Sequence, residues 1–179
     1  MEISQKKIQS WIDTLLFCNA IPKNMEAIVE YFYESFVQSP EEFYALLKRI
    51  KRVLSNSAVS AEKKQTLAKK YLDILSLITE RFGFYQEKTL LDELCFQIAL
   101  PLEYRKIVEK MKAHQVRSKK LISAVIRKFK TVMLKRALRC KVYGRRKNLY
   151  SIYKKLKKDP RKKFEDCRDI FAFRIITPS

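Results

Sequence analysis

The stretch SKKLISAVIRKFKTVMLKRALRCKVYGR, residues 118–145, contains the point at which the periodicity of the chain changes. Its first part repeats apolar residues at the 3.6-residue spacing of a helix, with lysines and arginines between them. The apolar positions of this helix are Leu121, Ile122, Val125, Ile126, Phe129, Val132, Met133 and Leu138. From Arg139 the pattern changes to the alternation of a short strand that ends at Gly144. The sequence therefore predicts a long basic helix over 118–139 that leads into a strand.

Residues 1–104, before this stretch, carry apolar positions at helical spacing with helix start and stop signals between them. Ser39 and Ser60 can cap helices, Gly83 fits a C-terminal helix end, and Pro101 follows a further helix. We therefore expect a compact bundle of five short helices. Its expected apolar positions are Ile8, Trp11, Ile12, Leu15, Leu16, Met25, Ile28, Val29, Phe32, Phe36, Phe43, Leu46, Leu47, Ile50, Val53, Leu54, Leu67, Tyr71, Leu72, Leu75 and Ile78.

The residues after the basic helix predict a strand–helix–strand unit. KNLYSIYKKLKK at 147–158 has a helical pattern, and DIFAFRII at 169–176 is a β-branched and aromatic run typical of a strand. One such unit cannot cover both faces of a sheet, so we expect only the start of an α+β domain. The predicted fold is mainly α, with a helical bundle over 1–104, basic linker helices over 105–138 and the incomplete domain over 139–179.

The charge of the chain is concentrated in one block. The net charge is +20, and the segment Arg105–Lys163 holds 24 Lys and Arg against 2 acidic residues. The rest of the chain is almost neutral, with 15 basic and 17 acidic residues. Such a block suits nucleic-acid phosphate, anionic lipid or the phosphates of a nucleotide, and charge alone does not choose among them.

Cysteine usage and hydropathy point to a reduced, soluble protein. The four cysteines are widely scattered and form no Cys-x-x-Cys pair, so neither a zinc site nor a disulfide framework is expected. The first residues lack the continuous apolar region of a signal peptide. No run approaches the roughly 18 apolar residues of a membrane span. We expect a cytoplasmic protein without a membrane partner.

The residues that could carry chemistry gather in the strand–helix–strand unit. They are Arg145, Arg146 and Lys147 at the expected strand-to-helix turn, Ser151 and Lys155 on the helix, and Asp169 and Arg174 on the second strand. Cations and helix N-terminal amides attract phosphate, and a lone carboxylate among cations suits Mg²⁺. This pattern describes a metal–nucleotide site. An Asp169–Arg174 surface pair or a helix cap accounts for the carboxylate equally well.

Two stretches, VYGRRKNLYSIYKKLKK and FEDCRDIFAFRII, resemble the start of the (p)ppGpp synthetase domain of the RelA/SpoT family. That family shows a Gly-Arg-x-Lys turn, Ser-Ile-x-x-Lys on a helix and Asp-x-x-Ala-x-Arg-Ile on a strand. The matching residues are Gly144, Arg145, Lys147, Ser151, Ile152, Lys155, Asp169, Ala172, Arg174 and Ile175. A weaker similarity upstream, to the segment that joins hydrolase and synthetase domains, runs through Arg81, Gly83, Lys88, Leu91, Leu94, Phe96, Pro101 and Tyr104.

The resemblance implies a nucleotidyltransferase-like fold and a role for each matched residue. Arg145 and Arg174 would enclose the adenine of ATP between them. Lys147, Ser151 and Lys155 would hold its phosphates, and Asp169 would bind Mg²⁺. The implied reaction is transfer of the β,γ-pyrophosphate of ATP to the ribose 3′-hydroxyl of GTP or GDP. This is a reaction in which positioning and charge neutralisation do most of the catalysis.

Departures from the family pattern limit this expectation. The family carries a glutamate in a later strand and a tyrosine that stacks on guanine, and both would lie beyond Ser179. We therefore expect a chain truncated within the synthetase domain, with an ATP half-site, no complete catalytic set and no activity alone. The hydrolase needs two histidines, but His114 is the one histidine, and Lys51 stands where a metal-binding aspartate would be. Hydrolase activity is not expected.

Three hypotheses remain open on the sequence. The first is the truncated synthetase, in which GTP or GDP binds only if another chain completes the site. The second is a regulatory or assembly module that pairs with a complete synthetase through an open sheet edge. The third is a basic RNA-binding or ribosome-binding protein that uses the block from Arg105 to Lys163.

Overall fold

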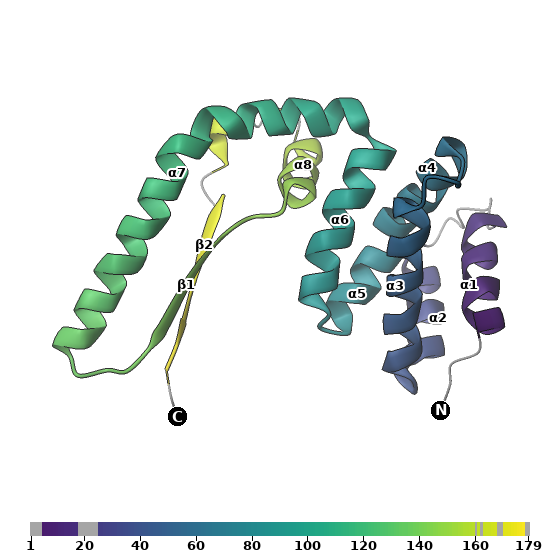
Figure 1. Ribbon diagram of the computed structural model, residues 1–179, viewed down its shortest axis with the longest axis horizontal. Helices are drawn as coiled ribbons and strands as arrows, with labels where there is room; N and C mark the ends of the chain where they lie inside the picture. The colour runs from purple at the N-terminus through teal and green to yellow at the C-terminus, as the bar shows by residue number, and fades with distance from the viewer. Residues whose placement is uncertain (1–4, 18–24, 160, 162, 168–169, 178–179) are drawn as a thin grey trace. The chain divides into compact units, whose positions relative to one another are not determined.

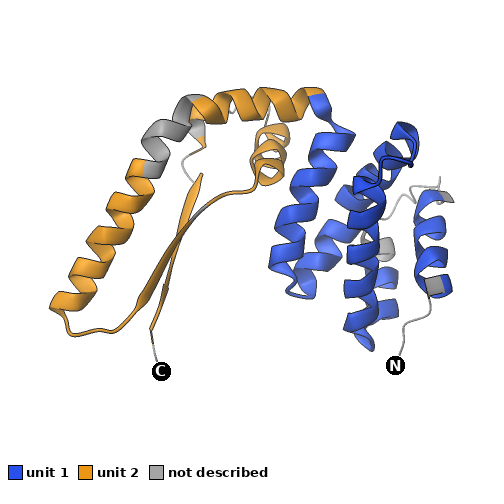
Figure 2. Cartoon of the chain, in the orientation of Figure 1, with its two compact units in different colours: residues 1–101 blue, residues 102–179 orange. Residues whose placement is uncertain are grey.

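The computed structural model describes residues 5–17, 25–159, 161, 163–167 and 170–177. Within these ranges, the side chains at 5, 17, 25–28, 113–119, 145 and 166 lie outside the description. The chain divides into two compact units, residues 1–101 and 102–179 (Figure 2), and each is described by itself. The described elements are helices with one two-stranded sheet, so the prediction of a mainly α fold is confirmed.

Unit 1 is a bundle of helices (Figure 1). Its elements are α1 (Gln5–Phe17), α2 (Met25–Val37), α3 (Pro40–Ser55), α4 (Ala61–Lys70), η1 (Tyr71–Leu75), α5 (Ser76–Arg81) and α6 (Tyr85–Ala99). The helix expected after the cap at Ser60 corresponds to α4, η1 and α5 together. Its middle turn, η1, is a π-helix, a feature that the apolar spacing did not indicate.

The apolar positions predicted for the bundle form its core. Most of these positions are buried, including Leu15, Phe43 and Tyr71, whereas Trp11, Leu16 and Val53 are partly exposed. The side chains of Met25 and Ile28 lie outside the description. Phe43 packs its ring 5.2 Å from that of Phe36 and 5.1 Å from that of Phe82, measured between centroids. Aromatic packing of this kind adds to the free energy gained by burial. The amphipathic pattern therefore specified which side of each helix faces inward.

Two of the predicted helix-end signals act as expected. The hydroxyl of Ser60 accepts a hydrogen bond from the backbone N–H of Lys63 at 3.4 Å, which caps α4. Gly83 has φ +75°, a left-handed conformation that favours glycine, and the N–H of Phe84 donates to the carbonyl of Thr79 at 3.1 Å. The Gly83 conformation and the Phe84 hydrogen bond fix where the chain turns between α5 and α6.

Among the described residues of unit 1, Lys88 and Asp92 form an ion pair that is largely buried. Lys88 Nζ is 2.7 Å from Asp92 Oδ2, and the two side chains are 12% and 1% exposed. A second carboxylate, that of the exposed Glu80, lies 3.6 Å from the same ammonium. Asp92 Oδ1 accepts no hydrogen bond within the described part of the chain. The charge of Asp92 is therefore compensated chiefly by Lys88.

Replacing Lys88 should destabilise unit 1 strongly. Lys88→Ala leaves a carboxylate buried without its cation, which costs about 3–5 kcal/mol of unfolding free energy. Lys88→Met combined with Asp92→Leu should recover most of that loss. The control is Lys7→Ala, which breaks an exposed 2.8 Å pair with Glu42 and should cost under about 1 kcal/mol. Urea unfolding measures all three, and equal costs for Lys88→Ala and Lys7→Ala would contradict the assignment.

The stability of unit 1 should fall in alkaline solution. Burial raises the pKa of the Tyr71 phenol and of the Cys95 thiol, and the negative charge of Asp92 raises both further. Both groups stay neutral in the fold but ionise in the unfolded chain near their ordinary pKa values of about 10 and about 8.5. Their contribution is complete below those values and is lost as pH rises. Melting temperature should decline above about pH 8.5, and less steeply in Tyr71→Phe/Cys95→Ser.

Unit 2 contains the long helix and the two strands. Its elements are α7 (Pro101–Lys135), which begins at the unit boundary, β1 (Lys141–Arg146), α8 (Leu149–Lys158), η2 (Phe164–Asp166) and β2 (Phe171–Ile176). The predicted start of the long helix at 118 is wrong, because α7 is continuous from Pro101, a residue that suits a first helical position. Its end also comes earlier than predicted, since Ala137 has φ +53°.

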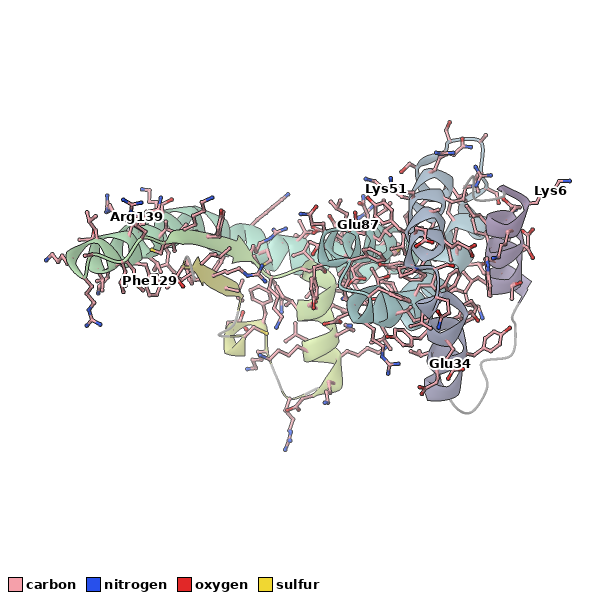
Figure 3. The ribbon with its side chains drawn as sticks, turned by 90° about the horizontal axis from the view of Figure 1, so that it is seen from below. Lys6, Glu34, Lys51, Glu87, Phe129 and Arg139 are labelled. Carbon is pink, nitrogen blue, oxygen red and sulfur yellow. The ribbon has the colours of Figure 1, made fainter. Side chains whose placement is uncertain are left out.

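The sheet consists of β1 and β2 in antiparallel register, with Lys141 opposite Ile176 and Arg146 opposite Phe171. One of its faces packs on the second half of α7, as Figure 1 shows. Phe129 of α7 contributes to this packing (Figure 3), with its ring centroid 6.1 Å from that of Phe173. No helix in the described part of the chain is long and apolar enough to cross a membrane.

Candidate nucleotide site

The outward face of the sheet presents the residues of the second strand that the resemblance singled out. Exposure alternates along β2, where Ala172 and Arg174 are exposed and Phe171, Phe173 and Ile175 are less so. On β1, Tyr143 is 52% exposed and its neighbour Val142 is 7% exposed. The register pairs Tyr143 with Arg174 and Arg145 with Ala172. The side chain of Arg145 lies outside the described residues.

The structure corrects the predicted strand-to-helix turn. We predicted that the strand ends at Gly144 and that Arg145 and Arg146 lie in the turn, but β1 continues through both. The pairing with β2 extends this far because Phe171 and Ala172 supply partners for the two arginines. The backbone N–H of Lys147 then donates to the carbonyl of Ile170 at 2.7 Å. Of the three basic residues, only Lys147 therefore lies between strand and helix.

The N-terminus of α8 is fixed by a side-chain cap. Asn148 Oδ1 accepts a hydrogen bond from the backbone N–H of Tyr150 at 2.8 Å. Ser151 lies in the first turn, where backbone N–H groups have no partner within the helix. Lys155 follows four residues later on the same side, and both residues are half-buried. Leu149 and Ile152 of α8 are buried and anchor the helix.

Some of the predicted residues are placed by the structure and others are not. It positions Lys147, Ser151, Lys155 and Arg174, whereas Asp169 lies outside the described residues. Among the side chains that are described, no three from His, Cys, Asp and Glu gather closely enough to hold a metal ion. On the hydrolase side, Lys51 is exposed on α3 (Figure 3), and the His114 side chain is outside the description.

Sequence reasoning missed two residues near this site. Tyr143 stands directly across from Arg174 on the outward face. Lys154 of α8 places its ammonium 5.0 Å from the ring centroid of Tyr150. The alternation of a strand could have indicated Tyr143, because residues two apart share a face, and it would also have separated Arg145 from Arg146.

Gly144 allows the sheet to approach α7 closely. A Cβ atom at this position would lie 2.7 Å from Ile122 Cγ2 and 3.2 Å from Ile126 Cδ1, both on α7. It would also lie 3.1 Å from a ring carbon of Phe173. The first distance is well inside van der Waals contact, where packing becomes repulsive. The glycine of the Gly-Arg-x-Lys motif therefore has a packing role on the inward face.

Gly144→Ala should destabilise unit 2. The added methyl group must displace Ile122, and overpacking of this kind costs about 1–3 kcal/mol. Adding Ile122→Ala should relieve the clash, so the double variant should be more stable than the sum of the two single effects predicts. Urea unfolding of the four chains measures this coupling. Ala172→Ser on the outward face is the control, with an expected change within about 0.5 kcal/mol. Strict additivity would argue against the contact.

No protein-family model matches the chain. Its curated relatives, however, are members of the RelA/SpoT family. The chain is 33% identical over 135 residues to the guanosine-3′,5′-bis(diphosphate) 3′-pyrophosphohydrolase of Spiroplasma citri, covering 75% of this chain and 18% of that protein. It is 31% identical over 156 residues to the bifunctional (p)ppGpp synthase/hydrolase SpoT of Escherichia coli, covering 84% and 22% respectively.

A third relative carries only the name of the synthetic activity. The chain is 34% identical over 121 residues to the GTP pyrophosphokinase of Myxococcus xanthus, covering 68% of this chain and 16% of that protein. The chain thus spans about a fifth of the length of these curated relatives. Hydrolase and pyrophosphokinase names both occur among them, and the chain belongs to the RelA/SpoT family.

Proposed function

We propose that this chain acts in (p)ppGpp metabolism by holding ATP on unit 2, as the ATP side of pyrophosphate transfer to GTP or GDP. The supporting observation is the layout of the matched motif. Arg174 lies on the outward face of the sheet, Lys147 at the end of β1, and Ser151 and Lys155 on one side of α8. ATP could therefore lie with its base against Arg174 on the sheet and its phosphates toward Lys147 and the N-terminus of α8.

The spacing on the sheet fits an adenine ring. Arg145 and Arg174 occupy diagonal positions of the antiparallel pair, because their partners are Ala172 and Tyr143. Diagonal residues in such a pair are roughly 7–8 Å apart. A flat ring in contact on both faces needs about 3.5–4 Å on each side, or about 7–8 Å in all. Guanidinium groups stack well on such rings.

The charge of the surrounding segment fits the phosphates. Residues 110–158 contain no Asp or Glu, so the segment that forms β1 and α8 is strongly basic. Lys147 and Lys155 would neutralise phosphate oxygens, while Ser151 and the first-turn amides of α8 would donate hydrogen bonds to them. Asp169 would hold Mg²⁺, which neutralises charge on the β- and γ-phosphates when it is bound.

The proposal covers only part of the reaction. The resemblance assigns residues of this chain to ATP and Mg²⁺, and it assigns none of the 179 residues to the guanosine nucleotide. We therefore expect ATP binding by the chain alone, without turnover. Hydrolysis of (p)ppGpp is not part of the proposal, since His114 is the only histidine available for a metal site that would need two.

Calorimetric titration with a slowly hydrolysed ATP analogue and Mg²⁺ tests the proposal. We expect one-to-one binding that Arg174→Ala weakens roughly tenfold, the effect of losing about 1.4 kcal/mol of stacking and charge. Asp169→Asn should weaken binding only when Mg²⁺ is present. The control is Arg139→Ala, which removes an exposed cation from the connection between α7 and β1 and should leave affinity unchanged.

The proposal fails if the wild-type chain binds no ATP analogue, or if Arg139→Ala weakens binding as much as Arg174→Ala does. In the second case the nucleotide would be held by general positive charge. Circular dichroism of each variant shows whether the fold is retained, so that loss of binding is not confused with unfolding.

A further inference from the structure

The second half of α7 carries a row of cations on one side. Five basic residues of this segment are exposed, with small, polar and aliphatic residues between them, and we refer to these five as the basic face. They are Lys120, Arg127, Lys128, Lys130 and Lys135. The exposed residues between them include Ser123, Ala124 and Thr131. The segment 120–135 is about 24 Å long at 1.5 Å per residue, so the cations form an extended and regular array.

The opposite side of the same segment is occupied by the sheet. Ile122 and Ile126 lie against Gly144, and Phe129 packs on Phe173. The helix can therefore not turn Ile122, Ile126 and Phe129 toward another surface without breaking their contacts with the sheet. The basic face points away from these contacts and is held in one orientation by them.

The cations of the basic face have no acidic partners. None of the five forms an ion pair within the described part of the chain, and there is no Asp or Glu in residues 110–158. Three further exposed cations, Arg136, Arg139 and Lys141, continue the array beyond the helix. Uncompensated charge of one sign on a rigid element is costly to the fold and attracts a polyanion.

We propose that the basic face of α7 binds the phosphodiester backbone of a double-stranded nucleic acid, independently of ATP. Its cations would contact phosphates, and the small side chains Ser123, Ala124 and Thr131 would let the helix approach the backbone closely. Such contacts position a protein on a duplex without reading its sequence. Binding should therefore be insensitive to base sequence and sensitive to salt.

Other polyanionic partners fit the surface less well. A single strand is usually held by aromatic stacking, and the exposed side of residues 120–135 carries no aromatic residue. An amphipathic helix binds a bilayer through a broad apolar face, but here Ile122, Ile126 and Phe129 lie against the sheet. Only Leu121, Val132 and Leu134 are left as exposed large apolar residues of the segment 120–135. Protein interfaces are depleted of lysine and enriched in aromatic residues, which is the reverse of this composition.

The test uses the full chain and fluorescence anisotropy with short duplexes of mixed sequence, one of RNA and one of DNA. The variant Arg127→Gln/Lys128→Gln/Lys135→Gln removes three charges from the basic face. The matched control Lys51→Gln/Arg52→Gln/Lys63→Gln removes three exposed charges from unit 1. Glutamine keeps helix propensity close to that of lysine and arginine, so both variants should fold.

We expect the basic-face variant to bind duplex at least tenfold more weakly than the wild-type chain, with the control within about twofold. The slope of log affinity against log salt should become less steep by about three. The RNA and DNA arms show which duplex is the better ligand. ATP-analogue binding should be unchanged in the basic-face variant, so failure here is distinct from failure of the ATP proposal.

Three results would overturn the inference. The first is equal loss of binding in the basic-face variant and the control. The second is a preference for single-stranded polyuridylate over both duplexes. The third is stronger binding to phosphatidylcholine vesicles that contain phosphatidylserine than to either duplex.

Discussion

The close contact between β1 and α7 at Gly144 is the constraint on which the second unit depends. A two-stranded sheet is marginal in water by itself and needs a packed face to be stable. Here that face rests on Ile122, Ile126 and Phe129 of α7. Because the inward face is fixed, the alternation of the strands also fixes which residues face outward. Arg174 and Tyr143 are presented to solvent for this reason.

The first unit depends on ordinary core packing, with a buried charge as its main exception. Its helices bury the apolar positions that their periodicity selects, and Gly83 turns the chain between α5 and α6. The Lys88–Asp92 pair is the exception, since it places two charges where apolar groups would pack. Lys88 and Gly83 both belong to the weaker upstream similarity. Their roles within this unit are structural, in an ion pair and in a turn.

Much of this fold could be predicted from the sequence because its helices are amphipathic. The bundle core, the cap at Ser60 and the two strands follow from local patterns that tertiary contacts did not override. The start of α7 could not be predicted, because Pro101 is compatible both with the end of one helix and with the first turn of the next. The π turn in η1 could not be predicted either, because the apolar spacing of Tyr71, Leu72 and Leu75 also fits an ordinary α-helix.

The candidate site was predictable to a smaller extent. The motif residues were identified by resemblance, but whether Arg145 lies in a turn or in a strand depends on its pairing with Ala172, a residue 27 positions later in the chain. Local sequence cannot show such a pairing. The same pairing separates Arg146, which is half-buried, from the outward positions.

Helix α7 contacts the sheet on one side and carries the basic face on the other. This arrangement limits how the length of the helix can change during evolution. One inserted or deleted residue within 120–135 would rotate the following positions by about 100°, since an α-helix has 3.6 residues per turn. Ile126 and Phe129 would then leave the sheet, and lysines would turn toward it. Substitutions that preserve character are tolerable here, but a change in residue number is not. Alignments of related chains should therefore show gaps before or after this segment and none within it.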